Sequence, residues 1–554
     1  MNNNYQKISF LLVVFLISLL TIQIVLADNY VVANTKDWKS LYEISVYAGF
    51  KNESFVFLKD LGDAEIKTKL MSKNDNIVVF ESMSNPVVKN YDSFLRINGY
   101  TLVGKYSFND VYDLQEYLHD QVKPKGDYLF SDDFGIEPLV ITPYLLKNDL
   151  FPLFYSQDSM RFLKKINRRE PIVAVGRIPV RPLSSLTNLK MLFGNPKDVS
   201  EKLTVKTFEN IPSEWGILTR IDAIDLTTLK EQKPLFVYFS EAYLDDLTSL
   251  VKKSEIKNYE VIGGDMADIS KTIEAKSGKN LNLMLKFGRK ITNLPGYEDK
   301  VLNVDVVSFP YPFEEIIVKS IKYDSGLGKL LLTLENKGNI DVYSFSNIDF
   351  SGLVVSDLEP HLIRSGETRT IPYSMNITKL EENATLTVKY GYSFPLKNSL
   401  STFGDAPIVR EKVSPVNNKE NNPSLIIKEA FLDTKRGVLI VHLEKKSPKD
   451  IKLRGELIIG ENHYLSDLKK ISSDKDDLLF ELPFVSNKDI LGKNVKLSVY
   501  YGENDLLFTK DKNLLIKEQT GDKYLIILTV TLIILVLLLA LFFILFKRRS
   551  GKDD

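Results

Sequence analysis

The feature that most constrains this chain is an uncharged run near its C-terminus. Residues 524–546 contain no charged side chain and consist mainly of Leu, Ile, Val and Phe. As an α-helix this run is roughly 34 Å long, and a membrane hydrocarbon core is about 30 Å thick. We therefore expect a transmembrane helix. Lys547, Arg548 and Arg549 follow it, so the positive-inside rule places the tail 547–554 in the cytoplasm and the preceding chain outside the cell.

The N-terminus predicts the same sidedness. Lys7 precedes an apolar stretch over residues 8–26, and Val25-Leu26-Ala27 resembles a signal-peptidase site. We expect a signal peptide over 1–27, cleaved after Ala27. The apolar stretch is longer than the roughly 7 to 15 residues usual for such peptides, so an uncleaved signal anchor is the alternative. Both interpretations leave the bulk of the chain extracellular.

Composition excludes several classes of function. The 554 residues include 72 Lys plus Arg and 72 Asp plus Glu, so no net charge attracts nucleic acid. There is no Cys, which excludes disulfides, thiolate nucleophiles and Cys-based metal sites. At roughly 100 to 200 residues per domain, the extracellular part has room for three or four domains.

Residues 28–300 are predicted to form an α/β domain. Short apolar runs alternate there with amphipathic stretches, and runs such as Ile172-Val173-Ala174-Val175 suit parallel strands covered by helices. The expected strands are Tyr30–Ala33, Phe55–Leu58, Ile77–Phe80, Tyr128–Phe130, Leu153–Tyr155, Ile172–Val175, Leu235–Phe239, Glu260–Ile262 and Leu281–Lys286.

This domain contains a repeat. The strand-turn-helix pattern from Tyr30 recurs from Tyr128 at a spacing of about 97 residues, and a third copy is expected to open at Leu235. The third copy carries Gly263-Gly264-Asp265 followed by a helix through Ala267-Asp268-Ile269-Ser270. This pattern resembles cell wall binding repeat 2, a family that usually has three tandem α/β repeats. In bacterial members the resemblance implies attachment to envelope polymers, and similar repeats occur in archaeal surface proteins.

Residues 310–412 and 424–517 are predicted to be two tandem β-sandwiches. Ile316–Glu335 aligns without a gap onto Leu425–Glu444 at an offset of 109, and Leu386–Gly391 matches Leu497–Gly502 at an offset of 111. The apolar period of two indicates antiparallel strands. Modules of this size resemble the immunoglobulin-like stalk modules of surface proteins. Residues 413–423 are expected to be a polar linker between them.

Few side chains suggest a chemical site. His119, His361, His442 and His463 are spread over separate modules without metal-ligand spacing, so neither a zinc site nor a catalytic triad is predicted. Asp265 is expected to cap the helix that follows it, and no catalytic or cofactor-binding residue is assigned.

Two kinds of candidate remain. Asp132 and Asp133 follow a strand and are candidates for binding Ca²⁺, the alternative being helix caps on a solvated rim. Asn52, Asn376 and Asn383 begin sequons and are candidates for glycosylation.

These features predict a non-enzymatic structural protein of the cell surface, an S-layer or S-layer-like component anchored in the lipid bilayer. Its expected partners are other copies or other envelope proteins. Two alternatives stay open: an adhesin or polysaccharide-binding protein that uses the α/β repeats, and a membrane-tethered hydrolase. The transmembrane helix makes attachment through the repeats unnecessary, which favours surface assembly or recognition.

Overall fold

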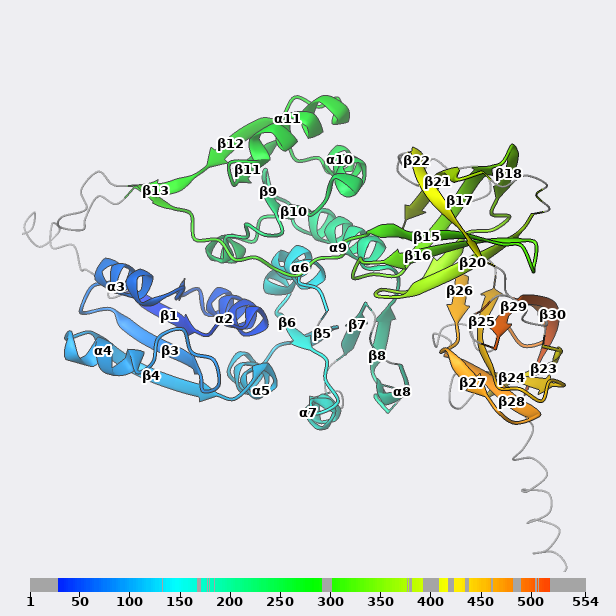
Figure 1. The fold of residues 1–554 in the computed structure, drawn as a ribbon. Coiled ribbons are helices and arrows are strands. Elements are labelled where there is room, and N and C mark those ends of the chain that lie inside the picture. The colour runs from blue at the N-terminus through cyan, green and yellow to red at the C-terminus, as the bar shows by residue number, and fades with distance from the viewer. Residues whose placement is uncertain are drawn as a thin grey trace, which may run out of the picture. The chain divides into compact units, whose positions relative to one another are not determined.

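The computed structural model divides into two compact units, one ending at Pro312 and one beginning at Phe313 (Figure 1). Among the residues that it describes, no helix is long and apolar enough to cross a membrane. The predicted signal peptide and transmembrane helix both lie outside the described residues. The structure describes residues 28–518 except 132, 167–170, 177, 179, 184, 291–300, 376, 378–380, 392–407, 417–422, 434–437, 460–461, 482–489, 504–505 and 507.

The first unit contains three four-stranded parallel sheets with the same strand order, which confirms the predicted α/β architecture of three repeats. In order across each sheet, the strands are β2 (Ser54–Phe57), β1 (Asn29–Asn34), β3 (Asn76–Ser82) and β4 (Thr101–Phe108); β6 (Leu150–Phe154), β5 (Gly126–Phe130), β7 (Ile172–Val175) and β8 (Leu189–Leu192); β10 (Leu235–Tyr238), β9 (Trp215–Arg220), β11 (Asn258–Ile262) and β12 (Asn282–Lys286).

Helices connect these strands, and a short hairpin follows the third sheet. The helices are α2 (Trp38–Lys51), α3 (Leu61–Leu70), α4 (Tyr91–Ile97), α5 (Val111–Val122), α6 (Ile136–Lys147), α7 (Met160–Ile166), α8 (Val180–Leu183), α9 (Pro196–Asn210), η1 (Leu226–Glu231), η2 (Glu241–Tyr243), α10 (Leu244–Lys253) and α11 (Met266–Ser277), and the hairpin is β13 (Gly288–Lys290) with β14 (Val301–Asn303).

Three strands of the parallel sheets, β4, β8 and β9, and the two hairpin strands were missed from the sequence, and the predicted start of the third repeat was wrong. The third repeat opens with β9 at Trp215, and the apolar run at Leu235 is its second strand. β4 and β8 are edge strands whose exposed and half-buried residues give no continuous apolar run. Strands with one unpaired edge tolerate polar residues and glycine, so their composition resembles that of loops.

Local sequence sets the helix starts. Asp37 accepts a hydrogen bond from the Ser40 backbone N–H (2.9 Å) at the start of α2. Asp265, predicted to cap α11, makes no such bond, and its carboxylate lies 3.2 Å from the Arg220 guanidinium instead. The predicted side-chain cap is therefore wrong, and Asp265 instead forms an ion pair with Arg220 at the end of β9.

The helices that follow the first strand of each repeat, α2, α6 and η1, contact one another. Tyr42 of α2 is fully buried, and its hydroxyl donates to the Pro138 carbonyl of α6 (3.0 Å). Glu43 is also fully buried in α2, and neither of its carboxylate oxygens has a hydrogen-bond partner among the described residues. The three repeats therefore share one packed centre.

The segment 304–311, here called the strap, crosses the carboxyl ends of the strands in all three repeats (Figure 1). Ile224, after β9, exchanges two backbone hydrogen bonds with Val307 (2.9 and 3.1 Å). Gly135, after β5, donates its N–H to Pro310 (2.9 Å), and a Cβ there would lie 2.6 Å from the Phe309 ring. The predicted end of this domain at residue 300 leaves out the strap, which belongs to this unit.

The second unit is all-β, as predicted, and consists of two modules that each form one eight-stranded sheet. The first module contains β18 (Leu353–Ser356), β17 (Val342–Phe350), β21 (Asn383–Gly391), β22 (Ile408–Val416), β15 (Ile316–Asp324), β16 (Lys329–Asn336) and β20 (Thr368–Ser374), with β19 (His361–Ile363) beside β17; the second contains β26 (Asn462–Leu465), β25 (Ile451–Ile459), β29 (Asn494–Gly502), β30 (Phe508–Glu518), β23 (Leu425–Asp433), β24 (Val438–Lys445) and β28 (Lys475–Glu481), with β27 (Lys469–Ile471) beside β25.

The two modules are true structural repeats. β15 and β23 carry a register shift at the same aligned position, after Val318 and after Ile427. β22 extends to Val416, so residues 413–416, predicted as linker, belong to the first module. The immunoglobulin-like identity of these modules stays a prediction.

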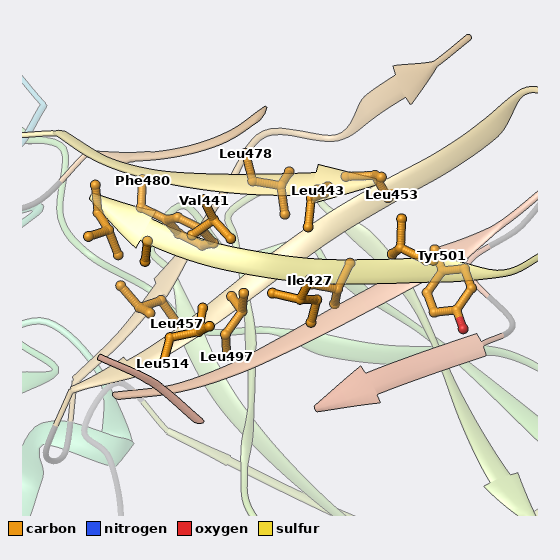
Figure 2. Close-up of a cluster of buried hydrophobic side chains, with 14 of the residues drawn as sticks. Ile427, Val441, Leu443, Leu453, Leu457, Leu478, Phe480, Leu497, Tyr501 and Leu514 are labelled. Carbon is orange, nitrogen blue, oxygen red and sulfur yellow. The ribbon is translucent and has the colours of Figure 1, made fainter. Parts of the chain in front are cut away.

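Each module encloses its own apolar core. Figure 2 shows the core of the second module, where Val441 of β24 and Leu457 of β25 meet although their strands are not neighbours in the sheet. Leu331, from β16 of the first module, also belongs to this cluster and is 5% exposed. The two modules are therefore joined by apolar packing as well as by the chain.

Replacing Glu43 with Gln should stabilise the first unit at neutral pH. Burial raises the pKa of Glu43 well above its usual value, and the charge of Asp37 adds to this effect. The folded state keeps a proton that the unfolded chain releases above about pH 4.3, so this group lowers stability as the pH rises. We expect Glu43→Gln to raise the melting temperature at pH 7 by roughly 2–4 °C per kcal/mol gained, and to have little effect at pH 4.

Both tryptophans, Trp38 and Trp215, lie in the first unit, so their fluorescence follows its unfolding. Glu65→Gln, at an exposed position of α3, is the matched control and should change nothing. Equal destabilisation by Glu43→Gln at both pH values would contradict the prediction.

Candidate functional site: the junction between the two all-β modules

The structure does not bring the sequence-predicted site residues together. Asp132 and Asn376 lie outside the described residues, and Asp133 is exposed. Asn52 is exposed at the C-terminal end of α2 with a φ of 54°, and Asn383 is half-buried at the start of β21. Within the described part of the chain, no three ligating side chains are placed to hold a metal ion. Glycosylation at Asn52, Asn376 and Asn383 and calcium binding at Asp132 and Asp133 stay predictions.

A buried ion pair lies instead where the two all-β modules meet. Arg369 of β20 and Glu456 of β25 come within 2.6 Å, and their side chains are 5% and 2% exposed. The guanidinium also donates to the Leu362 carbonyl (2.6 Å) and lies over the Tyr500 ring, 4.6 Å from its centre. The Tyr500 hydroxyl donates to Glu456 (3.1 Å). Both charges are thus compensated by short polar contacts, as buried charges require.

One of the four histidines, His463, contacts this pair, and His361 lies along the cavity beside the pair although it belongs to the other module. His463 of β26 lies 2.8 Å from Glu456 through Nδ1, and its ring packs edge-on against Tyr343 of the first module at 5.3 Å. His361 of β19 lies 3.1 Å from Asp357. Residues that are about 100 positions apart in the chain meet because the two modules pack against each other.

The electrostatics of the junction favour the ionised form of Glu456. Burial alone would raise the pKa of this carboxyl, but the Arg369 charge and the hydrogen bond with His463 hold it well below its usual range. Burial also raises the pKa of Tyr343 to about 12, so this hydroxyl stays neutral beside His463. At neutral pH Glu456 is therefore ionised and Tyr343 is neutral.

Further ion pairs surround the buried pair. Arg454 of the second module pairs with Glu367 of the first, and Lys496 lies 2.8 Å from Glu359. Arg364 lies 3.0 Å from Asp467 and also donates to the Leu465 carbonyl. Exposed pairs contribute little alone, but together they fix the rotation of one module against the other.

A cavity of about 380 Å³ lies beside the ion pair. The β18–β19 loop and β20 of the first module line one side, and β25, β29 and β30 of the second line the other. Its walls mix carboxylates, histidines, tyrosines and prolines. The cavity lies on the interface between the two modules.

Sequence reasoning missed this site because its residues alternate with apolar residues in ordinary strands. A period of two assigns Glu456 to the polar face of β25 with Lys452 and Arg454, and it gives no reason to single out Arg369, which shares a face of β20 with Ile371 and Tyr373. The tandem repeat could have pointed to the site, because positions that are charged in one module and uncharged in the other indicate a surface with a role in only one of the two modules. Arg454 and Glu456 align with Phe345 and Asn347 at the offset of 109.

No family model and no curated protein matches the chain. Among solved structures, Cwp8 from Clostridium difficile is 14% identical, covering 46% of this chain and 48% of its own, with a TM-score of 0.38. Cwp6 from Clostridium difficile is 11% identical, covering 46% and 44%, with a TM-score of 0.38. The YadV chaperone is 19% identical, covering 36% and 99%, with a TM-score of 0.14.

The chain thus spans less than half the length of the two clostridial proteins. TM-scores below 0.5 do not establish a shared fold, so these similarities imply nothing about function. The three-repeat α/β architecture is confirmed by the strand order, and its assignment to cell wall binding repeat 2 stays a prediction.

Replacing Arg369 with Met should destabilise the second unit by about 3–5 kcal/mol, because Glu456 would be left buried without its counter-ion. Scanning calorimetry should show a lower melting temperature for this unit, while tryptophan fluorescence from the first unit stays unchanged. Adding Glu456→Met should restore part of the loss. The matched control is Lys319→Met, which breaks an exposed pair with Glu335 and should cost less than about 1 kcal/mol. Equal losses in the two single variants would rule out a central role for the buried pair.

The junction should also be sensitive to acid. Because the folded pKa of Glu456 is lowered, its ionisation stabilises the protein above the unfolded pKa of about 4.3, and this contribution is lost as the pH falls below that value. We expect Glu456→Gln to be less stable at pH 7 and to lose less stability between about pH 5 and pH 2 than the unmodified chain. Calorimetry of the second unit across this range is the measurement, and parallel curves for both proteins would contradict the prediction.

Proposed function

We propose that this chain is a non-enzymatic structural protein of the cell surface, an S-layer or S-layer-like component anchored by residues 524–546. The observation that carries the proposal is the buried junction between the two all-β modules. Modules joined by a flexible linker do not require a buried ion pair such as Arg369–Glu456 between them. A stiff stalk requires a single fixed angle between its modules, which this pair supports.

The junction restricts the modules in two ways. Leu331 inserts into the core cluster of the second module, which resists separation because apolar surface would return to water. The ion pair and the hydrogen bonds around it are directional, so they resist rotation. Two modules held in this way behave as one element of the stalk.

The first unit supports the same proposal. Open α/β sheets bind small ligands in crevices at the carboxyl ends of their strands. In this chain the strap runs across these ends, and Phe309 packs against Trp38 (5.5 Å) and Gly135. The strap therefore occupies the position where a ligand usually binds, and it holds the three repeats together there. This favours an assembly element over an enzyme.

The proposal is tested on cells that carry the full chain, a deletion of the chain, or a version without residues 524–554. The full chain should fractionate with membranes and be cleaved by external protease, and the truncated version should appear in the medium. Cryo-tomography should show surface density that the deletion removes or thins.

Unchanged surface density in the deletion strain would overturn the structural proposal. If purified residues 28–518 were then retained on isolated envelope polymer, the polysaccharide-binding alternative would take its place.

A further inference from the structure

The strap is attached to the three repeats in different ways. At the third repeat it exchanges two backbone hydrogen bonds with Ile224, and Phe309 donates its N–H to the Ile221 carbonyl (3.1 Å). At the second repeat, Gly135 donates its N–H to the Pro310 carbonyl (2.9 Å). Among the described residues, no backbone hydrogen bond joins the strap to the first repeat. Contact with the first repeat therefore depends on side chains.

One carboxylate of the strap is paired with two lysines of the first repeat. Asp305 lies 3.0 Å from the Lys59 ammonium and 2.8 Å from the Lys67 ammonium. Lys59 lies between β2 and α3, and Lys67 lies on α3. These three residues are here called the clasp. Burial alone would raise the pKa of Asp305, but the hydrogen bonds and charges of Lys67 and Lys59 hold it below its usual value, so Asp305 is ionised at neutral pH.

The clasp residues line a cavity at the boundary between the first and third repeats. The cavity has a volume of about 360 Å³, and α3 lines it on the side of the first repeat while η1 and β12 line it on the side of the third. A second cavity of about 300 Å³ lies between Val306, Val307 and the residues that follow β1 and β2, and Lys59 lines both cavities. Atoms beside a cavity lack packing partners, so apolar contacts contribute less to the attachment here and the ion pairs contribute more.

Elsewhere the first and third repeats are packed together. η1 contacts α2 and β2, and the Trp38 ring of α2 lies 5.5 Å from the Phe309 ring of the strap, which is 2% exposed. Lys59 and Asp305, in contrast, have side chains that are 39% and 26% exposed. The boundary thus has a buried apolar part, which can serve as a pivot, and a charged edge, which the clasp closes.

Opening of the clasp leaves no buried charge without a partner. Lys67 is 7% exposed, and it also lies 2.8 Å from Asp63 and donates to the Phe57 carbonyl (2.6 Å). Asp305 and Lys59 are exposed enough to be solvated once they separate. The large cost of leaving a buried charge unpaired therefore does not arise. The closed and open states consequently differ by little more than two partly screened ion pairs.

We propose that the clasp is a two-state device that opens and closes the boundary between the first and third repeats. In the closed state Asp305 binds Lys59 and Lys67. In the open state the strap stays on the third repeat through its backbone hydrogen bonds, and the first repeat turns away about the η1 contact. Opening admits solvent to the carboxyl ends of β1 and β2, the position at which open α/β sheets bind ligands. This inference goes beyond the proposed function and does not depend on it.

Electron paramagnetic resonance measures the opening directly. The chain has no Cys, so spin labels can be attached at Glu65→Cys on α3 and Asn303→Cys on β14, two exposed positions on the two sides of the boundary. In the full chain with both labels, Asp305→Asn should raise the ratio of molecules with the longer label distance to those with the shorter by about tenfold or more, because it removes two charge-assisted contacts. A tenfold change in this ratio corresponds to about 1.4 kcal/mol.

Two variants serve as matched controls. Asp63→Asn also removes a carboxylate from Lys67 but leaves Asp305 paired with both lysines, so the label distances should not change. Lys59→Met removes one of the two ion pairs of Asp305 and should give a smaller increase than Asp305→Asn. Tryptophan fluorescence should show that the first unit is folded in all three variants at the temperature of the measurement.

The inference is overturned if Asp305→Asn leaves the label distances unchanged. It is also overturned if Asp63→Asn gives the same increase, since the effect would then follow from weaker pairing of Lys67 and not from release of the strap. Should Asp305→Asn unfold the first unit, Lys59→Met decides, because equal distances with and without this substitution would exclude the clasp. Membrane fractionation and surface tomography are unaffected by these results, so failure of the clasp is distinguishable from failure of the proposed function.

Discussion

The all-β half of this protein depends on one desolvated ion pair between residues of different modules. Burying Arg369 and Glu456 costs solvation free energy that only a precise set of partners offsets, here Tyr500, His463 and the Leu362 carbonyl. Any other angle between the modules would leave one charge buried without its partner or return both to water. The pair therefore selects a single arrangement, and the surrounding ion pairs and Leu331 stabilise that arrangement.

In the α/β half, apolar packing fixes the arrangement of the three repeats. Three repeats meet through α2, α6 and η1, and the strap adds backbone hydrogen bonds and the Phe309 ring across their strand ends. In a chain without cysteine no covalent link can hold these repeats, so the contacts must be extensive. Glu43 is the exception within this centre, because it is buried without a hydrogen-bond partner among the described residues. Its proton, and not an ion pair, removes its charge.

The periodicity of the sequence predicted most of the elements, because strands buried on both faces and alternating strands have distinct apolar patterns. It failed for the edge strands β4 and β8, whose side chains are partly solvated, and for β9, which was assigned to no repeat. The strap was left out of the predicted α/β domain because its role depends on contacts with Ile224 and Gly135, which are far away in the sequence. The junction was missed for a similar reason, because Glu456 in an alternating strand has the same pattern whether it faces water or another module, and the partner of Arg369 lies 87 residues away in the sequence.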